Sequence, residues 1–262
     1  MNAILTAVIP VVIIGLICAV VLVTASILMA VKEDERIPKV RECLPGANCG
    51  ACGYAGCDGY AKAIVEDNAA PNLCVPGAKA TAEALGEVLG IEVEETEPKV
   101  AFVHCAGDCE HTEDIVEYEG VDSCKAAKLI FGSKGKCSYG CLGLGDCKNA
   151  CPEEAIYIQN GVAKIGKQYC VGCGICVKTC PNKLISLIPN RDVRTVACSN
   201  QDKGAVTRKV CSAGCIACRK CVKACPNEAI SIFNNHAVID GDKCTGCGSC
   251  ESECVVGGIQ KN

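Results

Sequence analysis

Cysteine thiolates at short, repeated spacing are the residues of this chain best suited to chemistry. The chain has 27 cysteines among 262 residues. Runs that begin at Cys170 and Cys215 have the spacing C-x2-C-x2-C-x3-C-P, and the run from Cys244 has the same spacing without the proline. This spacing is typical of bacterial [4Fe–4S] sites, in which the fourth cysteine ligates the other cluster of a pair. The chemistry indicated is therefore one-electron transfer.

The last two runs together predict two complete clusters. Three thiolates on one loop can reach three irons of a cubane, and small intervening residues let backbone N–H groups approach the sulfides. The fourth ligand of each cluster then comes from the other run. We expect one cluster to be held by Cys215, Cys218, Cys221 and Cys254, and the other by Cys244, Cys247, Cys250 and Cys225.

An earlier copy of the same unit begins at Cys137, because "CSYGCLGLGDCKNACPEEAIYI" aligns without gaps with "CSAGCIACRKCVKACPNEAISI" from Cys211. Leu144 stands where the later copy has Cys218, so one ligand is missing unless Cys137 supplies it. A three-iron cluster at the deficient position is the alternative. We expect the clusters of this copy to be held by Cys137, Cys141, Cys147 and Cys180, and by Cys170, Cys173, Cys176 and Cys151.

A different cysteine cluster lies in "LPGANCGACGYAGC", residues 44–57. Cys49, Cys52 and Cys57 are separated by glycine, alanine and one tyrosine, and Cys74 follows after sixteen intervening residues. Three close thiols and one distant thiol suit a solitary cubane, and the glycines would let the loop wrap closely around it. Zinc is the alternative ligand for this group.

These five clusters leave seven cysteines without a role: Cys18, Cys43, Cys105, Cys109, Cys124, Cys198 and Cys211. Cys105, Cys109 and Cys124 could start a sixth site, with Cys198 or Cys43 as the fourth ligand. Buried free thiols are the alternative for all of them.

Composition and motifs exclude several classes of protein. An odd cysteine count, a long chain and C-x2-C spacing argue against a disulfide scaffold and favour a reducing compartment. Structural zinc usually takes two C-x2-C pairs a dozen or more residues apart, which these triples do not match. The sequence has no G-x-G-x-x-G motif, and His104, His111 and His236 form no evident acid–base set and are expected on the surface. With a formal net charge of −4, no nucleic-acid partner is expected.

The elements that position these cysteines begin with an apolar segment. Residues 4–31 contain no charged side chain, which exceeds the roughly 20 residues that a spanning helix needs and the h-region of a secretory signal. The first basic residues follow it: Lys32, Arg36, Lys39 and Arg41. The positive-inside rule then places the globular part in the cytoplasm, on the inner face of the cell membrane.

The rest of the chain predicts an α+β protein. "GAKATAEALGEVLG" favours a helix, and residues 91–122 hold eleven acidic residues and one lysine, which suggests a linker or solvated face. A hairpin is expected at Asn160-Gly161 and another at Asn234-Asn235. The expected organisation is an anchor over 1–31, a single-cluster domain over 32–90, an acidic connecting segment over 91–136, and two bacterial-type two-cluster ferredoxin modules over 137–190 and 191–262.

An N-terminal spanning helix, the "LPGANCGACGYAGC" motif and two ferredoxin modules in this order resemble the B subunits of Rnf complexes over nearly the whole chain. The resemblance implies a membrane ferredoxin:NAD oxidoreductase that couples electron flow to translocation of sodium ions or protons. This chain would take electrons from reduced soluble ferredoxin and pass them inward, with no catalytic centre of its own beyond electron transfer. Its partners would be the other Rnf subunits.

Ferredoxin docking is expected near the stretch between Cys198 and Cys225. This stretch holds six basic residues, and its only acidic residue is Asp202. These residues could steer an acidic partner, or they could offset the roughly −2 charge of each cluster. Other functions stay open: a membrane-anchored polyferredoxin that serves a hydrogenase or nitrogen-fixation system, an enzyme whose exposed cluster reduces a small substrate, or a zinc-binding membrane protein.

Overall fold

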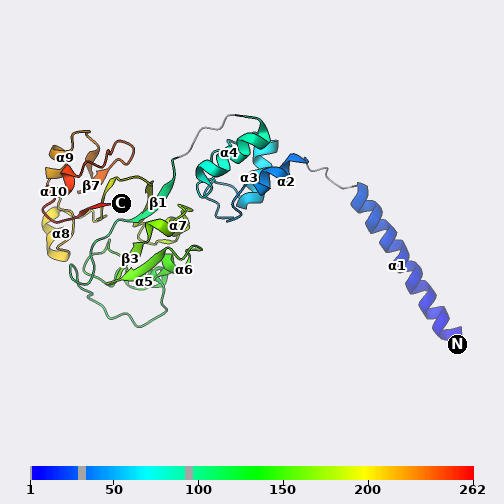
Figure 1. Cartoon of the computed structure of the whole chain (residues 1–262). Coiled ribbons are helices and arrows are strands. Elements are labelled where there is room, and N and C mark those ends of the chain that lie inside the picture. The colour runs from blue at the N-terminus through cyan, green and yellow to red at the C-terminus, as the bar shows by residue number, and fades with distance from the viewer. Residues whose placement is uncertain (1, 29–33, 92–96) are drawn as a thin grey trace.

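The computed structural model describes residues 2–28, 34–91 and 97–262, so Lys32 lies outside the described residues. Helix α1 (Asn2–Leu28) stands apart from the rest of the chain (Figure 1). Its segment Val8–Ser26 has a mean hydropathy of 3.0, is 0% buried, and is long and apolar enough to cross a membrane. The hydroxyl of Thr24 donates to the carbonyl of Val20 at 2.8 Å, so it is satisfied within the helix.

Three helices build the part of the chain that holds the "LPGANCGACGYAGC" motif. They pack around a small core that includes Val40, Tyr60 and Leu85 together with Cys57 and Cys74. The last of them is the helix expected from the sequence, and it ends at a glycine in the left-handed conformation. The helices are α2 (Arg36–Glu42), α3 (Gly56–Glu66) and α4 (Ala78–Leu89).

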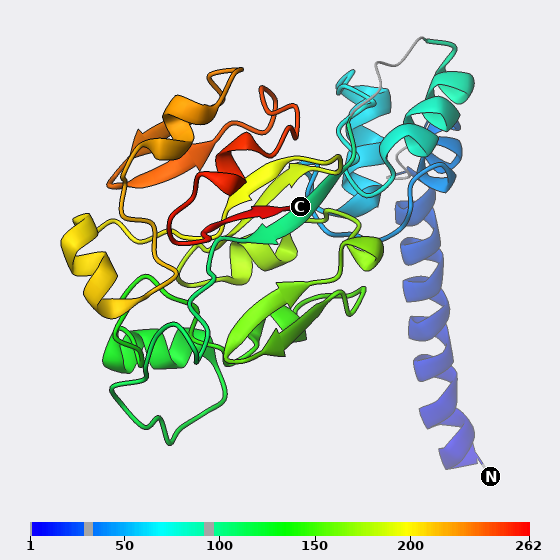
Figure 2. The same cartoon turned by 60° about the vertical axis from the view of Figure 1, so that its left-hand side comes forward.

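The rest of the chain consists of two repeats with the same strand pairing. In each repeat the first strand pairs antiparallel with the last, and the two middle strands form a hairpin (Figure 2). The first repeat contains β1 (Lys99–Val103), β2 (Ile156–Gln159), β3 (Val162–Ile165) and β4 (Ile185–Pro189). The second contains β5 (Arg194–Val196), β6 (Ile230–Phe233), β7 (His236–Ile239) and β8 (Ile259–Lys261).

Short helices complete both repeats in equivalent places. One precedes the cysteine run, one contains the third cysteine of that run, and one lies after the hairpin. In the first repeat these are α5 (Cys124–Phe131), α6 (Asp146–Asn149) and α7 (Ile175–Thr179), with a 3-10 turn η1 (Lys167–Tyr169) before α7. In the second they are α8 (Gly204–Val210), α9 (Lys220–Ala224) and α10 (Ser249–Ser252).

Both predicted hairpins are confirmed by the structure. Gln159 pairs with Val162 across a two-residue turn, in which Asn160 and Gly161 have φ of 50° and 79°. Asn234 and Asn235 have φ of 44° and 61° in the equivalent turn of the second repeat. Positive φ at both central positions is the requirement of a type I′ turn, which asparagine and glycine meet at least cost.

The segment expected as an acidic linker contributes two elements to the folded part. Strand β1 pairs with β4, with Val103 opposite Ile185, and Ala101 and Val103 belong to the core of the first repeat. Helix α5 lies in the same segment. The acidic composition of residues 91–122 hid the apolar run "VAFV", which forms most of β1.

Cysteines form a large share of the small core in each repeat. In the first, buried Cys147 and Cys176 pack with Ile156, Val162 and Leu184. The second repeat has the equivalent arrangement. Few large apolar side chains are buried in these repeats. A group bound by the cysteines would therefore form part of the core itself.

Candidate metal centres

The cysteines expected to hold the first cluster of the second repeat surround one cavity. Cys215, Cys218, Cys221 and Cys254 all line it, and most other lining residues are apolar. The backbone N–H of Ala237 donates to Cys215 Sγ at 3.4 Å. Burial raises the pKa of Cys221 to about 11, and the three neighbouring thiols add to the effect. The structure thus brings together the four residues that the spacing predicted.

The second cluster set of this repeat is brought together in the same way. Cys225, Cys244, Cys247 and Cys250 line one cavity. The backbone N–H of Arg194 donates to Cys244 Sγ at 3.4 Å. Cys225 belongs to the run of the first set and to the cavity of the second, so the two sets interlock as expected.

In the first repeat, the set of Cys151, Cys170, Cys173 and Cys176 also converges. Burial raises the pKa of Cys176 to about 11, with contributions from the nearby Cys173, Cys170 and Cys151. The N–H of Ala101 in β1 donates to Cys170 Sγ at 3.3 Å. This hydrogen bond matches the one that Arg194 in β5 donates in the second repeat.

The remaining set of the first repeat differs from the sequence expectation in one member. Cys141, Cys147 and Cys180 line a cavity with Cys124, and Cys137 does not line it. Burial raises the pKa of Cys147 to about 12, followed in effect by Cys141, Cys124 and Cys180. Cys137 lines a separate cavity. The geometry therefore favours Cys124 over Cys137 as the fourth member of this set.

Asp146 holds Cys124 in place. Its carboxylate accepts hydrogen bonds from the Ser123 hydroxyl (3.1 Å), the Cys124 N–H (2.9 Å) and the Lys125 N–H (3.0 Å). These N–H groups belong to the first turn of α5, where an acidic side chain is favourable. Because Asp146 adjoins Cys147, it ties the start of α5 to the cysteine run. Spacing in the sequence did not identify Cys124 as a member of this set, since it lies seventeen residues before the run that it joins.

The solitary set of Cys49, Cys52, Cys57 and Cys74 is also brought together. Burial raises the pKa of Cys74, and the nearby Cys57, Cys49 and Cys52 raise it further. The side chain of Asn48 accepts a hydrogen bond from the Cys57 N–H at 2.8 Å and so closes the loop onto the start of α3. The four cysteines therefore lie around one place, as the sequence indicated.

This solitary set adjoins the first repeat. The Lys178 ammonium on α7 donates to the carbonyl of Gly50 at 3.5 Å. Cys49 is among the charges that raise the pKa of Cys173, after burial. The motif loop and the second set of the first repeat therefore lie next to each other.

The residues present fit [4Fe–4S] clusters better than single metal ions. Within the described ranges, no group of three or more Cys, His, Asp or Glu is placed to hold one ion. A zinc ion would draw four sulfurs to within about 4 Å of one another, since the Zn–S bond is about 2.3 Å. A Cβ on Gly172 would lie 2.3 Å from the Lys99 carbonyl oxygen, and one on Gly246 would lie 2.0 Å from that of Asp192. Only glycine lets these cysteine loops approach the first strands so closely.

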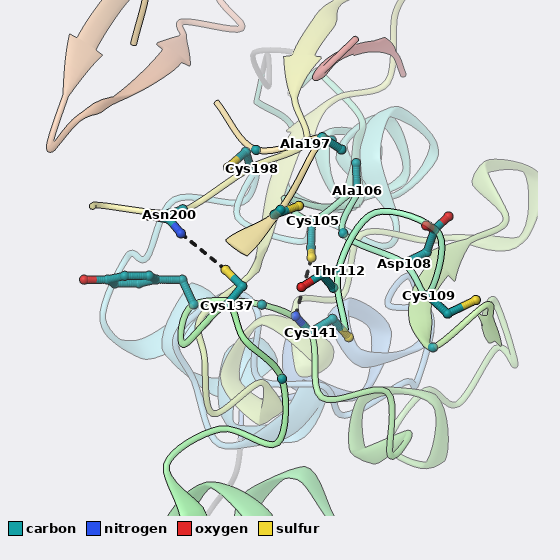
Figure 3. Close-up of a pocket in the computed structure, with 18 of the residues that line it drawn as sticks. Cys105, Ala106, Asp108, Cys109, Thr112, Cys137, Cys141, Ala197, Cys198 and Asn200 are labelled. Carbon is teal, nitrogen blue, oxygen red and sulfur yellow. Dashed lines mark hydrogen bonds between the residues drawn. The ribbon is translucent and has the colours of Figure 1, made fainter. Parts of the chain in front are cut away.

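Six cysteines outside these sets lie in the globular part that the structure describes, and one of them is Cys137. Cys43 donates to the Lys39 carbonyl oxygen at 3.3 Å and packs against the core that contains Cys57 and Cys74. The other four are Cys105, Cys109, Cys198 and Cys211, and together with Cys137 they line one cavity (Figure 3). The expectation that all histidines are on the surface is wrong for His104. Its ring nitrogens form hydrogen bonds with the Val196 carbonyl (2.8 Å) and with Ser186 Oγ (2.6 Å), and burial lowers its pKa.

Three protein-family models match the chain. The model described as "Putative Fe-S cluster" matches residues 44–76, which hold the solitary set. A "4Fe-4S binding domain" matches residues 163–186 in the first repeat, and a "4Fe-4S dicluster domain" matches residues 214–257 in the second. These matches support iron–sulfur clusters in all three parts of the globular region.

Curated relatives match nearly the whole chain. The chain is 43% identical to the B subunit of the Na(+)-translocating ferredoxin:NAD(+) oxidoreductase complex of Acetobacterium woodii, over 97% of this chain and 77% of the relative. It is 42% identical to the B subunit of the proton-translocating ferredoxin:NAD(+) oxidoreductase complex of Clostridium ljungdahlii, over 99% and 93%. The B subunit of the ion-translocating oxidoreductase complex of Methanosarcina acetivorans is 40% identical, over 92% and 91%. The chain therefore belongs to the family of B subunits of ion-translocating (Rnf) oxidoreductase complexes.

Proposed function

We propose that this chain accepts electrons from reduced soluble ferredoxin and relays them into a membrane-bound, ion-translocating ferredoxin:NAD oxidoreductase complex. A [4Fe–4S] cluster supplies reversible one-electron transfer at a potential set by its hydrogen bonds, charge and exposure. The observation that supports a relay is the continuity of the cysteine sets along the molecule. The solitary set adjoins Cys173 of the first repeat, and within each repeat the two sets interlock.

Twenty cysteines hold five clusters in this proposal. Four of the sets are those that the spacing predicts, and the fifth takes Cys124 in place of Cys137. The ligands are Cys49, Cys52, Cys57 and Cys74; Cys124, Cys141, Cys147 and Cys180; Cys151, Cys170, Cys173 and Cys176; Cys215, Cys218, Cys221 and Cys254; and Cys225, Cys244, Cys247 and Cys250.

The protein environment tunes these ligands through backbone hydrogen bonds. The N–H groups of Ala101, Arg194 and Ala237 each donate to a cysteine sulfur at 3.3–3.4 Å. Such donors stabilise the more negative, reduced state of a cluster. Burial raises the pKa of Cys147 to about 12 and that of Cys221 to about 11, so metal ligation must displace the proton of these buried thiols.

A basic patch marks the surface where an acidic electron donor would dock. The patch comprises Lys203, Arg208 and Lys209 on or next to α8, and Arg219, Lys220 and Lys223 on or next to α9. All six are exposed, and none forms an ion pair with another described residue. Both helices lie at the end of the globular part away from α2–α4 (Figures 1 and 2).

The patch adjoins an exposed cysteine of the second repeat through Arg219. Cys218 is exposed, and Arg219, the next residue, lines the same cavity. A donor held by the patch would therefore meet a cluster ligand that faces solvent. Complementary charge raises the association rate of such partners. We propose that electrons enter through the second repeat and leave through the solitary set.

The anchor places the relay at the membrane. In this proposal α1 spans the membrane once, with the globular part on the cytoplasmic side, because Arg36, Lys39 and Arg41 follow the helix. No charged residue lies in α1, so ion translocation belongs to partner subunits of the complex.

Reduction by ferredoxin tests the function directly. The full chain is purified anaerobically in detergent, and its iron, sulfide and zinc are counted. It is then mixed with ferredoxin that was reduced beforehand. The proposal expects at least about 20 iron and 20 sulfide per chain and electron paramagnetic resonance (EPR) signals of reduced clusters after mixing. Zinc with little iron, or loaded clusters that ferredoxin cannot reduce, would overturn it. Copurification with a hydrogenase instead of other Rnf subunits would favour the anchored-donor alternative.

A further inference from the structure

Four cysteines outside the five sets are related by the internal repeat. Cys105 lies two residues after β1, and Cys198 lies two residues after the equivalent strand β5. Cys137 and Cys211 each lie four residues before the first cysteine of the run in their repeat. Each repeat therefore contributes the same pair of positions, one after its first strand and one before its run.

The structure brings these two pairs together between the repeats. The Cys105, Cys198 and Cys211 side chains are 7–9% exposed, and all four cysteines line one cavity of about 260 Å³ (Figure 3). Hydrogen bonds join the strand ends, since the Ala106 N–H donates to the Ala197 carbonyl at 2.9 Å. A cavity of this size, lined by four cysteines at positions that the two repeats share, has room for a bound group.

The sulfurs point toward shared neighbours. A Cβ built on Gly107 would lie 3.1 Å from Cys211 Sγ and 3.8 Å from Cys105 Sγ, so both sulfurs face the same side of this glycine. The Asn200 side-chain amide donates to Cys137 Sγ at 3.3 Å. Burial raises the pKa of Cys198 to about 11, and Cys137 is among the nearby charges that raise it further.

Cys109 lines the same cavity but does not belong with the four. It is exposed, and in Figure 3 it lies apart from Cys105, Cys137 and Cys198, with its sulfur directed away from them. It occupies neither of the two positions that the repeats share, the one after the first strand and the one before the cysteine run.

We propose that Cys105, Cys137, Cys198 and Cys211 hold a sixth [4Fe–4S] cluster at the junction of the two repeats. The site touches a set in each repeat. The Cys141 N–H donates to Cys105 Sγ at 3.4 Å, and the Cys215 N–H donates to Cys198 Sγ at 3.2 Å. The sixth site thereby lies between a set of the first repeat and a set of the second, and it would shorten the steps of the electron path between them.

This inference rests on the proposed function, and metal content separates the two. The full chain, including α1, is purified anaerobically in detergent. Its iron and sulfide are measured, and its protein concentration is determined by amino-acid analysis. A sixth cluster gives about 24 iron and 24 sulfide per chain, and five clusters give about 20 of each. A value near 20 would overturn the sixth site and leave the relay intact. Little iron would overturn both.

Variants assign the site. Cys105→Ser and Cys198→Ser should each lose about four iron and four sulfide, and the double variant should lose no more than either single variant, because both residues serve one cluster. Cys109→Ser, the matched control from the same cavity, should lose none.

Additive loss in the double variant, or equal loss in the control, would overturn the assignment. The wild-type count remains decisive if a variant fails to fold, since it needs no substitution. Circular dichroism of each variant identifies that case.

Discussion

The assignment of Cys124, in place of Cys137, as the fourth ligand in the first repeat can be tested by moving this ligand to another position. Cys124→Ala removes one thiolate from the set with Cys141, Cys147 and Cys180. We expect a loss of about four iron per chain, or about one iron if a three-iron cluster remains. Against about 24 iron in the wild type, these losses are about a sixth and about a twenty-fourth of the total.

The repeat offers a rescue position for this variant. Leu144 aligns with Cys218 of the second repeat, and it packs against the small buried group that contains Cys124. Leu144→Cys in the Cys124→Ala background should therefore return the fourth thiolate from the loop itself. We expect recovery of most of the lost iron.

Iron, sulfide and the EPR spectra of oxidised and reduced protein measure both steps, with Cys43→Ala as the control that should lose no iron. Unchanged iron in Cys124→Ala would refute the assignment. A second comparison separates Cys124 from Cys137. Because the two lie in different cavities, the double variant Cys124→Ala, Cys137→Ala should lose about twice the iron of either single variant. Equal losses in the three variants would place both cysteines at one site.

Three further predictions concern docking, positioning and stability. Arg219→Glu with Lys220→Glu changes the charge of the basic patch by about four units and should slow reduction by ferredoxin about tenfold or more at low salt, with the difference vanishing near 1 M salt. Stopped-flow rates against ionic strength measure this effect. Lys39→Glu with Lys62→Glu, at the far end of the globular part, is the matched control, and an equal effect there would contradict docking at the patch. Asp146→Ala removes three hydrogen bonds that position the start of α5 and should speed iron release to a chelator about tenfold or more, whereas an unchanged release rate would show that the clamp is dispensable. Complete cluster removal should abolish most of the circular dichroism of the two repeats, since cysteines make up so much of their cores; a retained spectrum would show that the repeats fold without metal.

Local spacing was enough to predict much of this protein. The runs from Cys170, Cys215 and Cys244 predict their ligand sets because a cubane demands three thiolates from one short loop. Asn160-Gly161 predicts its hairpin because the turn requires positive φ at two successive residues. The apolar segment at the start and the helix α4 follow from composition and periodicity in the same way, without reference to any distant part of the chain.

Contacts between distant segments were beyond such reasoning. Cys124 joins the run at Cys141 only because Asp146 binds the first turn of α5, and no spacing rule relates the two. Strand β1 belongs to the first repeat because its N–H and carbonyl groups pair with β4, more than eighty residues later. The backbone hydrogen bond from the Ala106 N–H to the Ala197 carbonyl brings the chain after β1, with Cys105, to the chain after β5, with Cys198. A ligand supplied from within a loop is written in the sequence, whereas a ligand supplied from another segment depends on the hydrogen bonds and packing that bring the two segments together.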